Sequence, residues 1–131
     1  MIVVDSSAMV DLLLQRPGRA AAVTQRLGEH VGAIFCPHLL DVEVASALRR
    51  HVLSGRINGK QLNVAIGQLR LFPLRRFGHE LLIARALQLR DNVTAYDGVF
   101  LALAEALGAP LLTCDARLAR VPGLGVEVLV A

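Results

Sequence analysis

The sequence predicts an α/β fold, a three-layer sandwich in which a twisted parallel sheet of four to five strands carries helices on both faces. Short apolar runs alternate with longer helical stretches along the whole chain, and the connections between them are short. Strands separated by helices in this way are typical of parallel sheets. The length of 131 residues fits one ordinary domain, spanning residues 1–131, and leaves no room for a second.

Each predicted element has a recognisable start or end. Arg16-Pro17-Gly18 ends the first helix, because proline and glycine interrupt helical geometry. Pro37 is expected to open the third helix, Thr94 to cap the last one and Gly108 to close it. Strands are expected at residues 2–5, 32–36, 74–77, 110–113 and 125–130, and helices at residues 7–15, 19–29, 37–53, 60–71, 79–90 and 95–107.

Composition argues against several classes of protein. Apolar residues make up 54% of the chain, yet no apolar stretch reaches the roughly 18 uncharged residues of a membrane span, so we expect a cytoplasmic protein. No GxGxxG follows the first strand, and Gly59-Lys60-Gln61 lacks the rest of a phosphate-binding loop, which argues against a nucleotide cofactor. Cys36 and Cys114 follow apolar runs and are expected to be buried thiols rather than a disulfide or zinc ligands.

The net charge of +3 comes from thirteen arginines and a single lysine. Arginine suits phosphate groups because its planar guanidinium can donate to two oxygens at once. The excess of positive charge is too small to identify a nucleic-acid-binding protein by itself.

Four carboxylates stand out by their positions: Asp5, Glu43, Asp97 and Asp115. Asp5 follows the apolar run at residues 1–4 and Asp115 follows another at 110–114, so two parallel strands would each lead into an acid. Open α/β sheets bind their ligands at the carboxyl edge of the strands, so both acids are expected at a functional edge. The other two acids come from predicted helices.

Three of these acids also have an ordinary structural interpretation. Asp5 can cap the helix that follows it, which is worth about 1 kcal/mol, and Asp115 can cap a short turn in the same way. Thr94-x-x-Asp97 matches a capping box, in which the acid accepts from the amide of the cap residue. Position alone leaves both interpretations open for Asp5 and Asp115 and favours the structural one for Asp97.

Glu43 is the most informative of the four acids. It lies in the middle of the predicted helix 37–53, with leucine, serine and alanine at the neighbouring helical positions, so no local cation is available. A carboxylate on such an apolar segment is costly unless it is paired, bound to a metal or exposed on a narrow stripe.

Convergence of the four carboxylates would require a cation. Each close pair about 4 Å apart costs roughly 4 kcal/mol of repulsion at an effective dielectric of about 20. Oxygen ligands without a Cys or His cluster favour Mg²⁺ or Mn²⁺ over Zn²⁺. Such a site performs phosphoryl chemistry with a metal-activated water. The histidines show no spacing typical of a general base, so that water is expected to be the nucleophile.

Four short motifs, in this order, resemble a PIN-domain ribonuclease. They are Met1-Ile-Val-Val-Asp5-Ser6-Ser7-Ala8, Pro37-x5-Glu43, Tyr96-Asp97 and Leu111-Leu112-Thr113-Cys114-Asp115, and they span nearly the whole chain. The compact length is similar to that of the VapC-type toxins of toxin–antitoxin pairs. The resemblance implies an acidic quartet of Asp5, Glu43, Asp97 and Asp115, supported by hydroxyls at Ser7 and Thr113. Gly98 departs from the pattern, where alanine is more frequent; it is expected to be harmless and to leave that turn less rigid.

The resemblance also implies an activity and partners. It implies Mg²⁺- or Mn²⁺-dependent endonucleolytic cleavage of RNA, inhibition by a cognate VapB-type antitoxin, and a homodimer. The expected RNA contacts are the arginines whose segments flank the acidic edge: Arg16, Arg19, Arg49, Arg50, Arg117 and Arg120. An antitoxin helix is expected on the excess apolar residues of helices 37–53 and 60–71: Leu39, Leu40, Val44, Leu48, Leu62, Val64, Ile66 and Leu69.

Other acids and other functions are weaker candidates. Asp11 is expected at the surface of the first helix, and Asp41 is expected to pair with His38 three residues earlier, so neither is a predicted ligand. A response-regulator-like phosphoacceptor would need a second acid at the first strand and a late lysine, and both are missing. A non-catalytic PIN-fold module for binding proteins remains the main alternative, although it has no reason to keep Glu43 in an apolar helix.

Overall fold

The computed structural model describes residues 1–131 and contains one five-stranded sheet in which every neighbouring pair is parallel. The sheet has the order β3-β2-β1-β4-β5. Its strands are β1 (Ile2–Val4), β2 (Ile34–Pro37), β3 (Arg75–Phe77), β4 (Leu111–Thr113) and β5 (Val128–Val130). The predicted α/β fold with four to five parallel strands is therefore confirmed. The strand order reverses at β1, which places the topological switch point between β1 and β4.

The central strand β1 owes its place to an uninterrupted apolar run. Ile2, Val3 and Val4 are fully buried, as expected for a strand with hydrogen-bonded neighbours on both sides and helices on both faces. Val3 pairs with Phe35 of β2 and with Leu111 of β4. This register brings the carboxyl ends of β1 and β4 to the same edge of the sheet.

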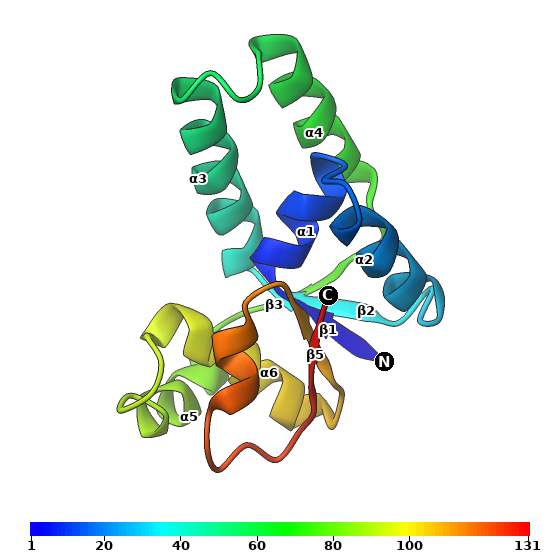
Figure 1. Cartoon of the computed structure of the whole chain (residues 1–131). Coiled ribbons are helices and arrows are strands. Elements are labelled where there is room, and N and C mark those ends of the chain that lie inside the picture. Colours follow the sequence, from blue (N-terminus) through cyan, green and yellow to red (C-terminus); the bar gives the residue numbers. More distant parts are fainter.

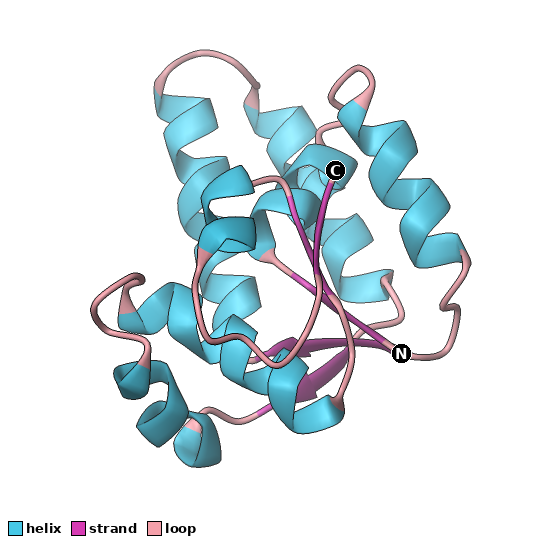
Figure 2. Ribbon diagram, turned by 60° about the horizontal axis from the view of Figure 1, so that its bottom comes forward, coloured by secondary structure: helices cyan, strands magenta, loops and turns pink.

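Helices cover both faces of the sheet (Figures 1 and 2). Helices α1 to α4 lie on one side, and α5 and α6 lie on the other. Their bounds are α1 (Ser6–Leu13), α2 (Arg19–Gly28), α3 (Leu39–Leu53), α4 (Gly59–Leu71), α5 (Ile83–Gln88) and α6 (Ala95–Leu107), with short 3₁₀ helices η1 (Glu80–Leu82) and η2 (Ala116–Arg120). Helix α6 is buried continuously from Gly98 to Ala104 because it packs on β1, β2 and β4. No helix is long and apolar enough to cross a membrane.

Two predicted helix starts are wrong for the same physical reason. Pro37 does not open α3 but ends β2, because it pairs with Phe77 of β3 and the next amide donates to the Phe77 carbonyl oxygen at 2.7 Å. The helix expected at residues 79–90 is divided into η1 and α5. Its first residue, His79, instead accepts a hydrogen bond from the Leu39 amide at 2.7 Å and is held at the start of α3. Tertiary hydrogen bonds thus override the local signals.

Gly98 has a packing reason that the sequence did not reveal. A Cβ placed there would lie 2.9 Å from the Ala86 Cβ and 3.0 Å from the Ala86 Cα. Real Cβ atoms do not approach other carbons so closely, so the glycine lets α5 and α6 pack against each other. The close contact lies one residue after Asp97, so it fixes how near the first turn of α6 lies to α5.

Candidate active site

Asp5 lies between β1 and α1, and its carboxylate is held by three donors. Its Oδ1 accepts a hydrogen bond from the Ser6 backbone N–H at 2.8 Å, so Asp5 caps α1 as its position suggested. Its Oδ2 accepts from the Ser7 hydroxyl at 2.8 Å and from the Thr113 hydroxyl at 2.7 Å. Only 4% of Asp5 is exposed. The cap and the functional interpretation are compatible, because capping uses one oxygen and leaves the residue at the sheet edge.

Ser7 and Thr113 connect the ends of β1 and β4. Each hydroxyl donates its single proton to Asp5. Ser7 Oγ also accepts from the Cys114 backbone N–H, and Thr113 Oγ1 accepts from the Asp115 backbone N–H, both at 3.0 Å. The two hydroxyls therefore fix the position of Asp5 relative to the backbone that carries Asp115.

Glu43 reaches the same edge from the second turn of α3. Its Oε1 accepts a hydrogen bond from the Ser6 hydroxyl at 3.1 Å. Burial raises the pKa of Glu43, the Ser6 hydrogen bond opposes that shift, and the negative charges of Asp5 and Asp97 add to it. The absence of a local cation was correctly read from the sequence, and a serine hydroxyl takes the place of a cation as its partner.

Asp97 lies in the first turn of α6 and forms only half of the predicted capping box. Its backbone N–H donates to Thr94 Oγ1 at 3.2 Å, but its own carboxylate does not accept from the cap amide. Burial raises the pKa of Asp97, the charges of Asp5 and Asp115 raise it further, and Arg117 lowers it. The carboxylate is thus free of a capping role and lies within electrostatic reach of the other acids.

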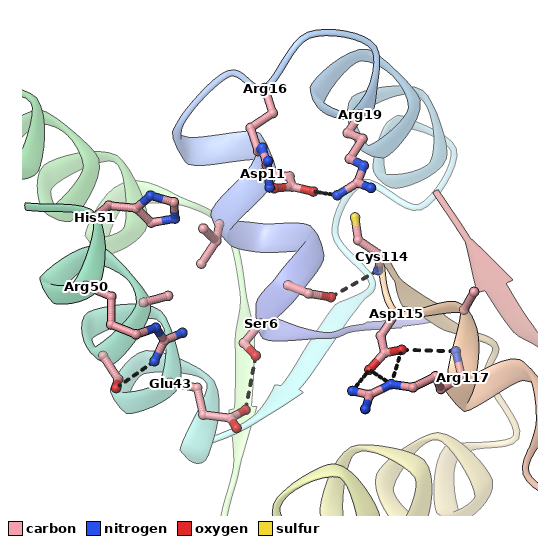
Figure 3. A pocket seen from close by; sticks show the side chains of 15 residues that line it. Ser6, Asp11, Arg16, Arg19, Glu43, Arg50, His51, Cys114, Asp115 and Arg117 are labelled. Atoms are coloured by element: carbon pink, nitrogen blue, oxygen red, sulfur yellow. Dashed lines mark hydrogen bonds and ion pairs between the residues drawn. The ribbon is translucent and has the colours of Figure 1, made fainter. Parts of the chain in front are cut away.

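Asp115 caps η2 and is also paired with a cation. Its Oδ1 accepts from the Arg117 backbone N–H at 3.0 Å, and the Arg117 guanidinium contacts both carboxylate oxygens, with Nη2 2.6 Å from Oδ2 (Figure 3). The hydrogen bond from the Arg117 side chain holds the pKa of Asp115 below its ordinary value, against a smaller opposing effect of burial. The exposed Arg117 is therefore bound to both oxygens of the Asp115 carboxylate.

The four acids lie within electrostatic reach of one another but do not form a closed ligand cage. No group of three or more His, Cys, Asp or Glu side chains is arranged closely enough to hold a metal ion as it stands. Arg117 and Ser6 hold Asp115 and Glu43 respectively, and like charges keep carboxylates apart. The donors are nevertheless all oxygens, and Asp97 has no hydrogen-bonding partner for its carboxylate. This chemistry fits a hard divalent cation.

A cavity of about 600 Å³ opens beside these acids between α1, α3 and the end of β4. Glu43 and Asp115 line it together with four arginines, Arg16, Arg19, Arg50 and Arg117 (Figure 3). These four belong to the six arginines expected at the acidic edge. Arg49 instead lines an apolar cavity between α3 and α4, and Arg120 lines neither.

The apolar cavity between α3 and α4 has a volume of about 270 Å³. Three of the residues expected to form a groove line it: Leu48, Leu62 and Ile66. Leu40, Val44 and Leu69 are buried in the core, as is Leu48 itself, and Leu39 is partly buried against it. Val64 lines a separate cavity with Leu13 and Lys60. The cavity between α3 and α4 therefore takes in three of the eight residues expected to form a groove.

Two predictions about the other acids were wrong. Asp11 is not at the surface but is 3% exposed, and it pairs with Arg16 and Arg19. Asp41 does not pair with His38; it accepts from Arg76 on β3 at 2.7 and 2.9 Å. In both cases the partner lies beyond the helix that carries the acid, so helical spacing could not identify it.

Ser6 and His51 line the cavity and were not predicted as functional candidates, and Asp11, which was considered and rejected as a ligand, lines it as well. Ser6 could have been noticed because two consecutive serines follow Asp5. His51, near the end of α3, carries no sequence signal for this position. Cys114 also lines the cavity and is only partly buried, whereas Cys36 is fully buried, and both are free thiols.

Comparison with known proteins identifies the family. The family model of the PIN domain matches residues 2–124. Ribonuclease VapC1 of Mycobacterium tuberculosis is 45% identical over 127 residues, which covers 96% of this chain and 94% of the relative. Among solved structures, FitAcB from Neisseria gonorrhoeae has a TM-score of 0.72 at 18% identity and covers 97% of this chain and 96% of its own.

A second solved structure, VapBC2 from Rickettsia felis bound to a DNA fragment from their promoter, has a TM-score of 0.67 at 17% identity. It covers 97% of this chain and 98% of its own. The likeness of both structures concerns the fold. The chain belongs to the PIN-domain family, and within that family it is similar to the VapC ribonucleases.

Proposed function

We propose that this protein is a VapC-type endoribonuclease that depends on a divalent cation, Mg²⁺ or Mn²⁺. The proposal is supported by four acids, Asp5, Glu43, Asp97 and Asp115, that lie within electrostatic reach of one another, two of which line a cavity together with four arginines. Acids alone would repel an RNA backbone, and arginines alone would bind it without cleaving it. The two together suit hydrolysis of a phosphodiester bond, and a relative named as a ribonuclease supports the same reaction class.

The residues of the site have three kinds of task in this proposal: holding the cation, orienting Asp5 and accepting a proton. Asp5, Asp97, Asp115 and Glu43 would hold the cation, while Ser7 and Thr113 keep Asp5 in one orientation by donating to it. A bound divalent cation would supply a Lewis acid that polarises a phosphate oxygen and lowers the pKa of water. Glu43 and Asp97, whose pKa values are both raised by burial, are the two carboxylates suited to accept a proton from the attacking water.

The proposal includes a VapB-type antitoxin as the natural inhibitor, a homodimeric toxin and action in the cytoplasm. A solved structure of the same fold is a toxin–antitoxin complex from Klebsiella pneumoniae, which supports pairing with an antitoxin. The apolar cavity between α3 and α4 suits the apolar face of a guest helix. An arginine or lysine that follows this helix would then reach the acids and replace the charge of the cation.

The test uses the purified protein, freed of antitoxin, with total RNA as substrate. We expect cleavage with Mg²⁺ or Mn²⁺, none with a chelator, and loss of most activity in Asp5→Asn, which removes a ligand charge and keeps the shape. Asp91→Asn removes an exposed charge outside the cavity and is the matched control. Cleavage that survives the chelator, or a fully active Asp5→Asn, contradicts the proposal. A non-catalytic module would cleave RNA under none of these conditions.

A further inference from the structure

Asp11 is a buried carboxylate that the proposed reaction does not use. It is 3% exposed, and each of its oxygens contacts one arginine: Arg16 Nη1 at 3.2 Å and Arg19 Nη1 at 3.4 Å. It also faces the Cys114 thiol, whose pKa is raised to about 12 by burial and by a hydrogen bond to Asp11. A carboxylate buried at this depth is costly unless it is paired, and the two arginines provide that pairing.

The turn between α1 and α2 creates this arrangement. Gln15 and Gly18 adopt left-handed backbone angles, with φ of 52° and 79°, and the Arg16 amide donates to the Asp11 carbonyl oxygen at 3.0 Å. The chain therefore reverses direction within a few residues. As a result, Arg16 and Arg19 flank Asp11 at one end of the cavity, while Glu43 lies at the other end (Figure 3). We call Arg16 and Arg19 the arginine pair.

The arginine pair differs from the other ion pairs of the molecule in what it leaves unused. Arg76 donates from two nitrogens to both oxygens of Asp41, and Arg85 donates to Glu105, to Gln88 and to the Gly123 carbonyl oxygen. Arg16 and Arg19 each donate once, and their side chains are 47% and 51% exposed. A guanidinium carries five N–H donors, so most donors of the pair remain available to a ligand.

The ligand that fits these donors is a phosphate. Two arginines share one carboxylate, which leaves one positive charge in excess, and planar guanidinium groups bind phosphate oxygens through paired hydrogen bonds. Because the arginine pair lines one continuous cavity with Glu43 and Asp115, an RNA strand cleaved beside these two acids would present a neighbouring phosphate to the pair. An acidic segment of a protein partner would also find donors here, but it would not explain the continuity with the acids.

We propose that the arginine pair binds a backbone phosphate beside the scissile one, and that Asp11 is the positioning residue that holds both guanidinium groups toward the cavity. This inference rests on the proposed ribonuclease function. It assigns to the α1–α2 turn a role in substrate placement. Asp11 touches neither the RNA nor a metal ion and acts only through Arg16 and Arg19.

The experiment uses a single-stranded RNA with one known cleavage site and a series of substrates with one neutral methylphosphonate linkage each. For the wild-type protein, one linkage beside the cleavage site should be sensitive, with kcat/KM lowered about tenfold, the size of a charge-assisted hydrogen bond. In Arg16→Gln and in Arg19→Gln this sensitivity should shrink, KM for unmodified RNA should rise about fivefold or more, and kcat should stay within about twofold. Each single variant leaves one arginine on Asp11, so the buried carboxylate stays paired and the fold is kept.

Asp11→Asn tests the positioning role, and Arg90→Gln is the control of equal charge outside the cavity. Asp11→Asn should raise KM and weaken the response to the sensitive linkage although it adds a positive charge to the site, which a purely electrostatic effect would not produce. Arg90→Gln should leave kcat, KM and the linkage response unchanged. Melting temperatures of all variants separate these effects from unfolding, and Arg19→Lys should restore less than half of the lost linkage response because lysine lacks the fork of donors.

Several outcomes overturn the inference. The arginine pair does not bind a neighbouring phosphate if the linkage response of Arg16→Gln and Arg19→Gln equals that of the wild type, or if kcat alone changes. Unchanged KM together with weakened binding of the antitoxin assigns the pair to a protein partner instead. If the wild-type protein cleaves no RNA at all, the proposed function itself fails and the inference fails with it, whereas normal cleavage with insensitive flanking linkages refutes the inference alone.

Discussion

Substitution of Gly98 by alanine tests the close packing of α5 against the first turn of α6, which carries Asp97. The new Cβ would lie 2.9 Å from the Ala86 Cβ, 3.0 Å from its Cα and 3.1 Å from its carbonyl oxygen. Two of these three atoms belong to the backbone, so α5 as a whole must move to admit the methyl group. Overpacking of this kind costs about 1–3 kcal/mol. Alanine returns about 1 kcal/mol of helix propensity.

The expected balance is a loss of about 1 kcal/mol in the free energy of unfolding, since the clash exceeds the gain in propensity. For a domain of this size such a loss lowers the melting temperature by about 4 °C. Urea denaturation in the presence of a chelator measures the effect without interference from bound metal. Because Asp97 precedes the clash by one residue, we also expect weaker Mn²⁺ binding by the same variant.

Gly67→Ala provides the matched control for this measurement. Gly67 lies within α4, and a Cβ there would meet nothing within 4 Å. The same exchange should therefore stabilise the protein by up to about 1 kcal/mol, the opposite sign. Combining Gly98→Ala with Ala86→Gly removes one of the three clashes, so the double variant should be less destabilised than the sum of the two single variants. If Gly98→Ala stabilises the protein as Gly67→Ala does, then α5 and α6 are not packed as described.

Two further predictions concern the acids. Asp97→Asn keeps the backbone hydrogen bond to Thr94, so in the presence of a chelator it should leave the free energy of unfolding unchanged or raise it. The control Thr94→Ala removes the cap and should cost about 1 kcal/mol. A comparable loss in Asp97→Asn would make Asp97 a structural cap. A carboxyl whose pKa is raised on folding destabilises the folded state above that pKa and ceases to do so as the pH falls. The metal-free protein should therefore become more stable as the pH falls from neutrality through the raised pKa values of Glu43 and Asp97. Chemical denaturation measures this trend, and either Mn²⁺ or Asp97→Asn should weaken it. Asp115, whose pKa is lowered, contributes the opposite trend at lower pH. Arg117→Gln removes the cation that occupies Asp115, so Mn²⁺ should bind up to about fivefold more tightly by calorimetric titration. Arg120→Gln on the same short helix should not change the affinity, and weaker Mn²⁺ binding by Arg117→Gln would refute the competition.

The strands and the acidic edge could be predicted because their signals are local. Asp5 directly follows the strand β1, and Asp115 follows β4 with only Cys114 between them. The parallel fold therefore brings both acids to one edge of the sheet without further information. Glu43 was noticed because its helix offers no cation. The capping alternatives for Asp5 and Asp115 were also correct, since both residues cap a helix in the structure.

What the sequence concealed depends on partners that are distant along the chain or lie beyond a turn. Asp11 looked like a surface acid because its two partners lie beyond the end of its helix: Arg16 is within the chain reversal at residues 15–18, and Arg19 directly follows it. The Asp41 partner comes from β3, thirty-five residues away. Gly98 looked like a neutral departure because nothing local indicates that α5 passes within van der Waals distance. In each of these three cases, the feature that the sequence did not predict is a tertiary contact with a residue outside the helix concerned.

The acidic edge combines a rigid member with an adjustable one. Asp5 is buried and accepts hydrogen bonds from neutral donors, a backbone amide and two hydroxyls. None of these donors carries a positive charge that would balance the carboxylate. Asp115 is held by Arg117, whose side chain is 84% exposed and is attached to a short 3₁₀ helix. An incoming cation can displace a solvated guanidinium far more easily than it can reorganise a buried network, because an exposed ion pair contributes little to stability. Substitutions around Asp5 should therefore alter the geometry of the reaction, while substitutions around Asp115 should alter the affinity for the cation.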